Sequence, residues 1–178
     1  MGNKVGTALA LSGLGEIAVR QGNLEHATTM LEESLRLRQE LGEKWGIAAS
    51  LGSLAWAAQH QGDFERATAL LGESLHIRQA INDPGGMAWC LEKLAEIAHI
   101  HKDDGLAALI FGAAATLRAS ANSVIDPTDL PEHDRLVADI RARLGDDIYD
   151  AVWAEGQAMP LEALLDYLFL GVDETSVR

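Results

Sequence analysis

Apolar positions from the N-terminus to Leu41 follow the period of an α-helix. Leu11, Leu14 and Ala18 fall at positions i, i+3 and i+7, so they share one face of a helix. A Gln-Gly-Asn turn at 21–23 interrupts the pattern, because its glycine can end a helix in a left-handed conformation and its asparagine can cap the next helix. A second amphipathic stretch follows at 24–41. The pattern therefore predicts two helices joined by a tight turn.

This pattern repeats along the chain with a period of 40. Laying residues 6–45 on 46–85 without a gap gives 16 identities, and a weaker third copy continues to Arg118. Self-similarity at a fixed spacing of this size is typical of a solenoid of stacked helical units. The prediction is an all-α chain with three helix-turn-helix pairs, at roughly 5–20 with 24–41, 46–60 with 64–81, and 86–101 with 104–120.

The repeat stops after residue 121. Pro127 and acidic residues mark a loop at 122–130, Pro131 follows it directly, and three further amphipathic stretches come after it. Because the last repeat of a solenoid needs a cover for its exposed face, we predict that residues 131–170 form C-terminal capping helices. The organisation expected is three helical hairpins in 1–121, the loop, the capping helices and a polar tail at 171–178.

Small residues occupy positions where two helices must come close. They are Gly15, Ala18 and Ala27 in the first copy and Ala55, Ala58 and Ala67 in the second. Larger side chains there would push the helices apart, at a typical cost of about 1–3 kcal/mol.

This alternation of leucines with small residues resembles the tetratricopeptide repeat. The matching pattern is Leu11-x2-Leu14-Gly15-x2-Ala18-x3-Gly22-x4-Ala27-x3-Leu31-x2-Ser34-Leu35. The resemblance implies a right-handed superhelix in which the first helix of each pair lines the concave side. The period of 40 exceeds the usual repeat of about 34 residues, which predicts second helices longer by more than a turn. Lys102 replaces the turn glycine in the third copy, where we expect the regular array to give way.

The C-terminal half carries a narrower resemblance. Leu109 to Ala114, the Arg-x-Arg-Leu-Gly run at 141–145, the Trp-Ala-Glu-Gly-Gln-Ala run at 153–158 and Leu161-Glu162 are similar to the repeat region of large bacterial ATPase-type (STAND/LuxR-like) transcriptional regulators. The resemblance implies the regulatory repeat domain of a signalling or transcriptional regulator. Neither a phosphate loop nor a DNA-recognition helix is present, so the chain is either an excised sensor portion or a stand-alone relative.

The net charge and the number of cysteines limit which binding partners and which cellular compartment we expect. The net charge is −13, with 13 acidic against 4 basic residues after position 121, so the chain would repel phosphate backbones and we expect no direct nucleic-acid binding. Cys90 is the single cysteine, which fits a reducing cytoplasm. No uninterrupted apolar stretch approaches the length of roughly 18 residues that a membrane span needs, so no membrane association is expected.

No pattern of catalytic or cofactor-binding residues emerges. The sequence has no phosphate-loop motif, and its six histidines form no His-Glu-x-x-His pair. His99 and His101 lie two positions apart, which puts them on different faces of a helix. We therefore expect no enzyme activity, no catalytic residue, no cofactor and no bound metal.

What the sequence does offer is a candidate binding groove on the first helices of the pairs. Its predicted residues are Glu16, Arg20, Trp56, Gln59, His60, Trp89, Glu92, Lys93, Glu96 and His99. Trp56 and Trp89 could anchor a peptide or apolar ligand, or they could pack between neighbouring repeats. Arg20, Lys93 and His60 could grip an anionic group, or they could simply solvate their helices.

The function predicted is a non-catalytic protein- or peptide-interaction module, a scaffold or sensor in which a partner in the groove shifts contacts between repeats. Two alternatives stay open. One is self-association into a homodimer through a first helix that leaves Ala8, Leu11 and the flank of Leu14 uncovered. The other is a sensor that holds a small-molecule effector in the groove.

Overall fold

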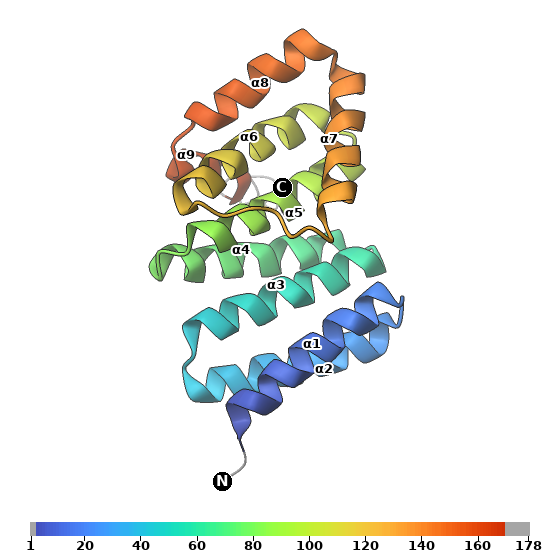
Figure 1. The fold of residues 1–178 in the computed structure, drawn as a ribbon, viewed down its shortest axis with the longest axis vertical. Helices are drawn as coiled ribbons and strands as arrows, with labels where there is room; N and C mark the ends of the chain where they lie inside the picture. Colours follow the sequence, from blue (N-terminus) through green and yellow to red (C-terminus); the bar gives the residue numbers. More distant parts are fainter. Residues whose placement is uncertain (1–2, 170–178) are drawn as a thin grey trace, which may run out of the picture. The chain divides into compact units, whose positions relative to one another are not determined.

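All regular elements of the described residues are α-helices. The computed structural model describes residues 3–169, so the predicted polar tail at 171–178 lies outside the described residues, as does position 170 of the predicted cap. The helices are α1 (Lys4–Arg20), α2 (Leu24–Leu41), α3 (Lys44–Gln61), α4 (Phe64–Ala80), α5 (Pro84–Ile100), α6 (Asp104–Ala121), α7 (Leu130–Leu144), α8 (Asp146–Ala158) and α9 (Leu161–Phe169) (Figure 1). The all-α prediction and the three helix pairs are confirmed.

The chain divides into two compact units. The first, residues 1–86, contains α1 to α4 and the first residues of α5, and the second, residues 87–178, contains the rest of α5 together with α6 to α9. In the first unit α1 packs along α2, α3 packs along α4, and α2 and α1 also contact α3. In the second unit α6 packs mainly against α8, and α7 contacts both of them.

The turns inside the helix pairs share one backbone conformation. Gly22 and Gly62 have φ values of 77° and 79°, in the left-handed region that glycine favours. Lys102 stands at the same place in the third pair and adopts φ 69°, so the turn survives without its glycine. The loss of the glycine therefore leaves the backbone conformation of this turn unchanged.

The extra length of the repeat is not confined to the second helices. The first helices of the three pairs have 17, 18 and 17 residues, and the second helices have 18, 17 and 18. Because both helices of a pair are equal to within one residue, the period of 40 is not produced by long second helices alone. This corrects the prediction from the sequence.

Small residues bring the helices of each pair together. Ala27 of α2 and Ala67 of α4 are fully buried, and a Cβ built on Gly15 would lie 2.7 Å from Cγ of Leu31. At the same contacts the Ser34 hydroxyl donates to the carbonyl oxygen of Ala8 and the Ser74 hydroxyl donates to that of Ala48, each at 2.8 Å. These hydrogen bonds require the two backbones to be close, which explains the small side chains around them.

A buried arginine follows four positions after each of these serines. Arg78 is buried and its Nη1 lies 2.5 Å from Oδ2 of Asp83. Arg38, only 4% exposed, reaches the Ser12 hydroxyl at 3.5 Å, while its Nε and Nη1 have no hydrogen-bond partner. The arginine position is thus kept in successive repeats while its partner changes.

The closest helix crossing in the second unit is between α6 and α8. A Cβ on Gly112 would lie 2.2 Å from the carbonyl oxygen of Trp153, and a Cβ on Gly156 would lie 2.0 Å from that of Leu109. The Thr116 hydroxyl donates to the carbonyl oxygen of Gln157 at 3.1 Å across the same contact. Two of the sequence blocks that suggested the regulator resemblance therefore meet here, backbone against backbone.

Within the described part of the chain, no helix is both long enough and apolar enough to cross a lipid bilayer.

The α6–α8 crossing leads to a stability prediction. Gly156→Ala forces a methyl group against a backbone carbonyl that cannot rotate away, so we expect the second unit to lose about 2 kcal/mol or more of unfolding free energy. Gly105→Ala is the matched control, because its Cβ would meet only the Asp103 carboxylate at 3.8 Å. Urea denaturation followed by circular dichroism measures both. Equal stability of the two variants would contradict the crossing.

Candidate functional site

The ten predicted groove residues fall equally into the two units, and each set has its own surroundings. Glu16 and Arg20 lie on α1 and Trp56, Gln59 and His60 on α3. The other five, Trp89, Glu92, Lys93, Glu96 and His99, lie on the part of α5 that belongs to the second unit.

In the first unit, Trp56 is the centre of a small stacked group. The Arg20 guanidinium lies over the indole ring, with Cζ 5.3 Å from the ring centroid, and the His60 ring meets it edge-on at 5.2 Å. One side of the half-buried indole packs on the core that contains Val19 and Leu54. Trp56 therefore packs against the core, which is one of the two roles considered from the sequence, and stays half-buried with the Arg20 guanidinium over its ring.

Glu16 has a structural partner in the same unit. Its Oε1 accepts a hydrogen bond from the Ser53 hydroxyl at 2.7 Å, which links α1 to α3. Gln59, also on α3, is half-buried. Of the first five predicted residues, the structure brings Arg20, Trp56 and His60 into direct contact.

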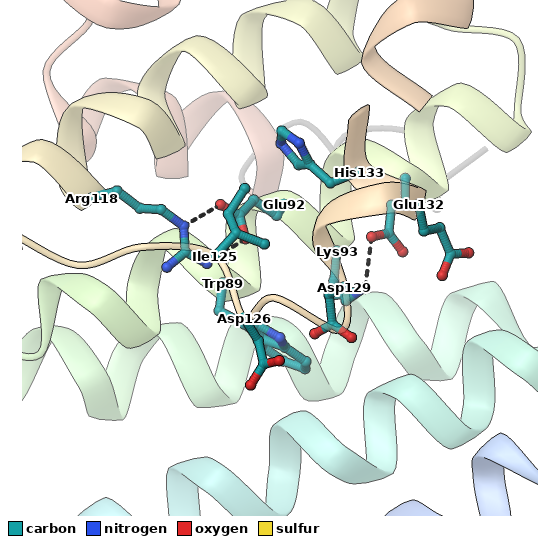
Figure 2. A pocket seen from close by; sticks show the side chains of 10 residues that line it. Trp89, Glu92, Lys93, Arg118, Ile125, Asp126, Asp129, Glu132 and His133 are labelled. Atoms are coloured by element: carbon teal, nitrogen blue, oxygen red, sulfur yellow. Dashed lines mark hydrogen bonds and ion pairs between the residues drawn. The ribbon is translucent and has the colours of Figure 1, made fainter. Parts of the chain in front are cut away.

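In the second unit, four of the five predicted residues line one depression (Figure 2). Its volume is about 30 Å³, room for about two water molecules. Trp89 lies beside it on α5, the loop after α6 closes one side, and the start of α7 closes another. The lining residues are Trp89, Glu92, Lys93, Glu96, Arg118, Ile125, Asp126, Asp129, Glu132 and His133.

Ion pairs within the lining fix its shape. Nε and Nη2 of Arg118 donate to the two carboxylate oxygens of Glu92 at 2.5 and 2.6 Å, and Nη1 donates to the carbonyl oxygen of Val124 at 3.0 Å. Such bidentate pairs are strong and directional. One guanidinium therefore ties α5, α6 and the loop at 122–129 together.

Lys93 also forms an ion pair within the site. Its Nζ lies 2.6 Å from Oε1 of Glu96 and 5.9 Å from the centroid of the Trp89 ring, a cation–π arrangement. The side chains of Lys93 and Glu96 are largely buried. In the structure, Lys93 is therefore already paired with a carboxylate, whereas the sequence suggested it as a partner for an anionic ligand.

The balance of charge around the depression is negative. Five of its ten lining residues carry carboxylates, and both of its permanent cations, Lys93 and Arg118, lie in ion pairs with two of them. The other carboxylates belong to Asp126, Asp129 and Glu132, on the loop and on the first turn of α7. The resulting field favours a positively charged group over an anion.

His99 lies outside the depression. Its Nδ1 is 2.5 Å from Oδ1 of Asp104 and its Nε2 is 3.2 Å from Oδ2 of Asp139, which also pairs with Arg143 at 2.8 Å. These contacts join the end of α5 to the start of α6 and to α7. The structure thus gives His99 a role in holding α7 rather than a place in the lining.

Six lining residues were missed from the sequence: Arg118, Ile125, Asp126, Asp129, Glu132 and His133. A signal existed for Arg118, because the repeat places it in register with Arg78 and Arg38, just as it places Glu92 in register with Ser12. The other five belong to the loop and α7, outside the repeat. No periodic pattern specifies where such a loop folds back.

In the described part of the chain, no group of three or more histidine, cysteine or acidic side chains is arranged to hold a metal ion.

Comparison with known families agrees with the helix pairs of the first unit. The family model of the tetratricopeptide repeat matches residues 6–80, the stretch that runs from α1 to the end of α4. The match supports a tetratricopeptide repeat region at residues 6–80. Tetratricopeptide repeats generally act as scaffolds for contacts between proteins, because stacked repeats create extended binding surfaces. No curated protein matches the chain.

The Arg118 pairing leads to a prediction for the site. Glu92→Ala removes the carboxylate that faces a largely buried guanidinium, so we expect the second unit to lose about 2 kcal/mol or more of unfolding free energy. Glu132→Ala, at an exposed position of the same depression, should change stability by less than about 0.5 kcal/mol. Urea denaturation of both variants measures the difference. A Glu92→Ala protein as stable as Glu132→Ala would rule out the proposed tie between α5 and the loop.

Proposed function

We propose that this chain is a non-catalytic protein-interaction module and that its second unit binds a basic segment of a partner at the Trp89 depression. The observation that carries the proposal is a half-buried tryptophan beside a depression whose carboxylates outnumber its cations. Tryptophan is among the side chains that contribute most to binding at protein interfaces. A tryptophan ring together with nearby carboxylates suits the apolar stem and charged end of a lysine or arginine.

The size of the depression supports a side chain as its occupant. Pockets for small ligands usually measure about 300–1,000 Å³, whereas this depression has a volume of about 30 Å³. That space accepts the end of one side chain from a partner that lies across the surface. The alternative of a small-molecule effector therefore finds less support in the second unit.

A regulatory use follows from what surrounds the depression. A partner at Trp89 would also touch the loop at 122–129 and the first turn of α7, which Arg118 and His99 connect to α5 and α6. Binding would then favour one arrangement of these segments. In a bacterial signalling or transcriptional regulator of the kind that the C-terminal blocks resemble, such a change could pass to a neighbouring domain.

The binding proposal is tested with a peptide library. An immobilised set of octapeptides that varies Lys, Arg, Glu and Leu is probed with the purified chain, and the best binder is measured by calorimetry. We expect binders rich in Lys or Arg, affinity that falls as salt rises, and at least tenfold weaker binding by Trp89→Ala. Trp45→Ala is the matched control, since Trp45 is exposed in the first unit.

Two outcomes would contradict the proposal. One is a preference for acidic or purely apolar peptides. The other is unchanged affinity of a folded Trp89→Ala protein. Trp56→Ala, measured in parallel, tests whether the Arg20–Trp56–His60 group of the first unit contributes to the same binding.

A further inference from the structure

The solvent-facing side of α1 is apolar over most of its length. Val5, Leu9, Leu14 and Ile17 are 52, 63, 51 and 52% exposed, and the small residues Gly6, Ala10 and Gly13 lie between them, the first half-buried and the other two exposed. At 100° per residue these seven positions occupy one half of the helix surface. We call them the α1 face. By contrast, the exposed side of α2 carries Glu25, Glu32, Arg36, Gln39 and Glu40.

Two charged residues fall within the same half of the helix surface as the α1 face, both near the C-terminal end of the helix. They are Glu16 and Arg20, and both turn toward α3, where Glu16 accepts from Ser53 and Arg20 lies over Trp56. The part of the face from Val5 to Leu14 therefore has no charged side chain of α1 within it.

The α1 face differs from the residues suggested by the sequence. Ala8 is 1% exposed and Leu11 is half-buried, so both belong to the inner side of the helix, and of the three only Leu14 is exposed. Uncovered apolar side chains in this number on one helix are typical of a contact surface.

The internal repeat shows which kind of element covers such a face. Ala10, Leu14 and Ile17 correspond to Ser50, Leu54 and Ala57, one period later on α3. Those α3 residues are buried, and Leu54 and Ala57 share a core with side chains of α1 and α2. The α1 face is therefore the register equivalent of a helix–helix interface that already exists in this chain.

The α1 face is bulkier than its α3 equivalent. Leu9 stands where α3 has Ala49, and Ile17 stands where α3 has the fully buried Ala57. Consider a further helix pair that packs on α1 in the way that α1 and α2 pack on α3. It would meet these larger side chains, and overpacking of that kind is destabilising. The occupant must instead offer small residues opposite Leu9 and Ile17, or side chains that fit beside them.

We propose that the occupant is a second copy of this chain, with the two α1 helices packed antiparallel about a two-fold axis. If the axis passes between positions 11 and 12 on the exposed side, Ile17 faces Gly6 of the other copy and Ala10 faces Gly13. Leu9 and Leu14 lie on opposite flanks of this contact, and each packs beside its own counterpart in the other copy. At each end of the contact, the large Ile17 side chain then lies against a glycine. At the centre, the two Ala10–Gly13 pairs allow the two helix backbones to come close. A face that complements itself in this way is what a two-fold interface requires.

Gly13 supports this arrangement independently. A Cβ built there meets no atom within 4 Å, so packing within the chain does not require glycine at this position. Glycine in the interior of a helix nevertheless weakens the helix relative to alanine. A close approach by another backbone explains the residue. Because a single helix contributes less area than the roughly 800 Å² per partner of a standard interface, we expect a weak dimer that dissociates on dilution.

Sedimentation velocity over a range of concentrations tests the proposal. The wild-type chain should shift from monomer to dimer as concentration rises. Ile17→Glu and Leu9→Glu should each weaken the dimer at least tenfold, because each would bury a carboxylate without a partner. Ile148→Glu is the matched control: Ile148 is 57% exposed but lies in the second unit, so this variant should dimerise like wild type.

The Gly13→Ala variant tests whether Gly13 serves a dimer interface or only the structure of the single chain. It should raise the midpoint of thermal unfolding, because alanine favours the helix, and at the same time weaken the dimer. A wild-type chain that stays monomeric at the highest concentration would overturn the proposal. Dimerisation that is unaffected by Ile17→Glu and Gly13→Ala would overturn it as well. None of these variants touches the Trp89 depression, so peptide binding tests the proposed function separately.

Discussion

Close approach of helix backbones is the constraint on which the rest of the structure depends. Where Ser34 and Ser74 donate to carbonyl oxygens of the preceding helix, the neighbouring positions carry fully buried alanines. Side chains larger than a methyl group would lengthen these hydrogen bonds and leave buried polar groups without partners. The α6–α8 crossing carries the same requirement further, since Gly112 and Gly156 leave no space even for a Cβ.

The depression at Trp89 depends on side-chain contacts between its elements. Glu92 of α5 and Arg118 of α6 form a largely buried ion pair, and Nη1 of Arg118 holds the loop at Val124. That loop then brings carboxylates from outside the repeat beside the tryptophan. The arginines at the equivalent position of the other two repeats have different partners. Arg38 contacts Ser12, whereas Arg78 pairs with Asp83, because the first helix of its pair has Gly52 at the position of Ser12. One arginine position therefore serves different purposes in successive repeats.

Local patterns were reliable where a short segment decides its own structure. The helices follow from the spacing of apolar residues, and the turns at Gly22 and Gly62 follow from the glycine conformation. Lys102 shows the limit of such rules: it adopts a left-handed φ because the helices on either side of it are already placed by packing. The ion pair of Glu92 with Arg118 could have been suspected, since both lie at repeat-equivalent positions, but the sequence does not show that they touch. The contact of His99 with Asp139 could not be read from the sequence, because Asp139 lies far along the chain on α7.

The sequence by itself determined the all-α class, the period of 40 and the small residues at the helix contacts, since these depend on local backbone preference and on side-chain volume. It did not determine which polar residues meet. That was decided by the tertiary structure, because the return of the loop at 122–129 and of α7 onto α5 depends on contacts between residues far apart in the chain. The same holds for α1: its spacing shows a helix with apolar residues on more than one side, and only the packed fold shows which of them face solvent.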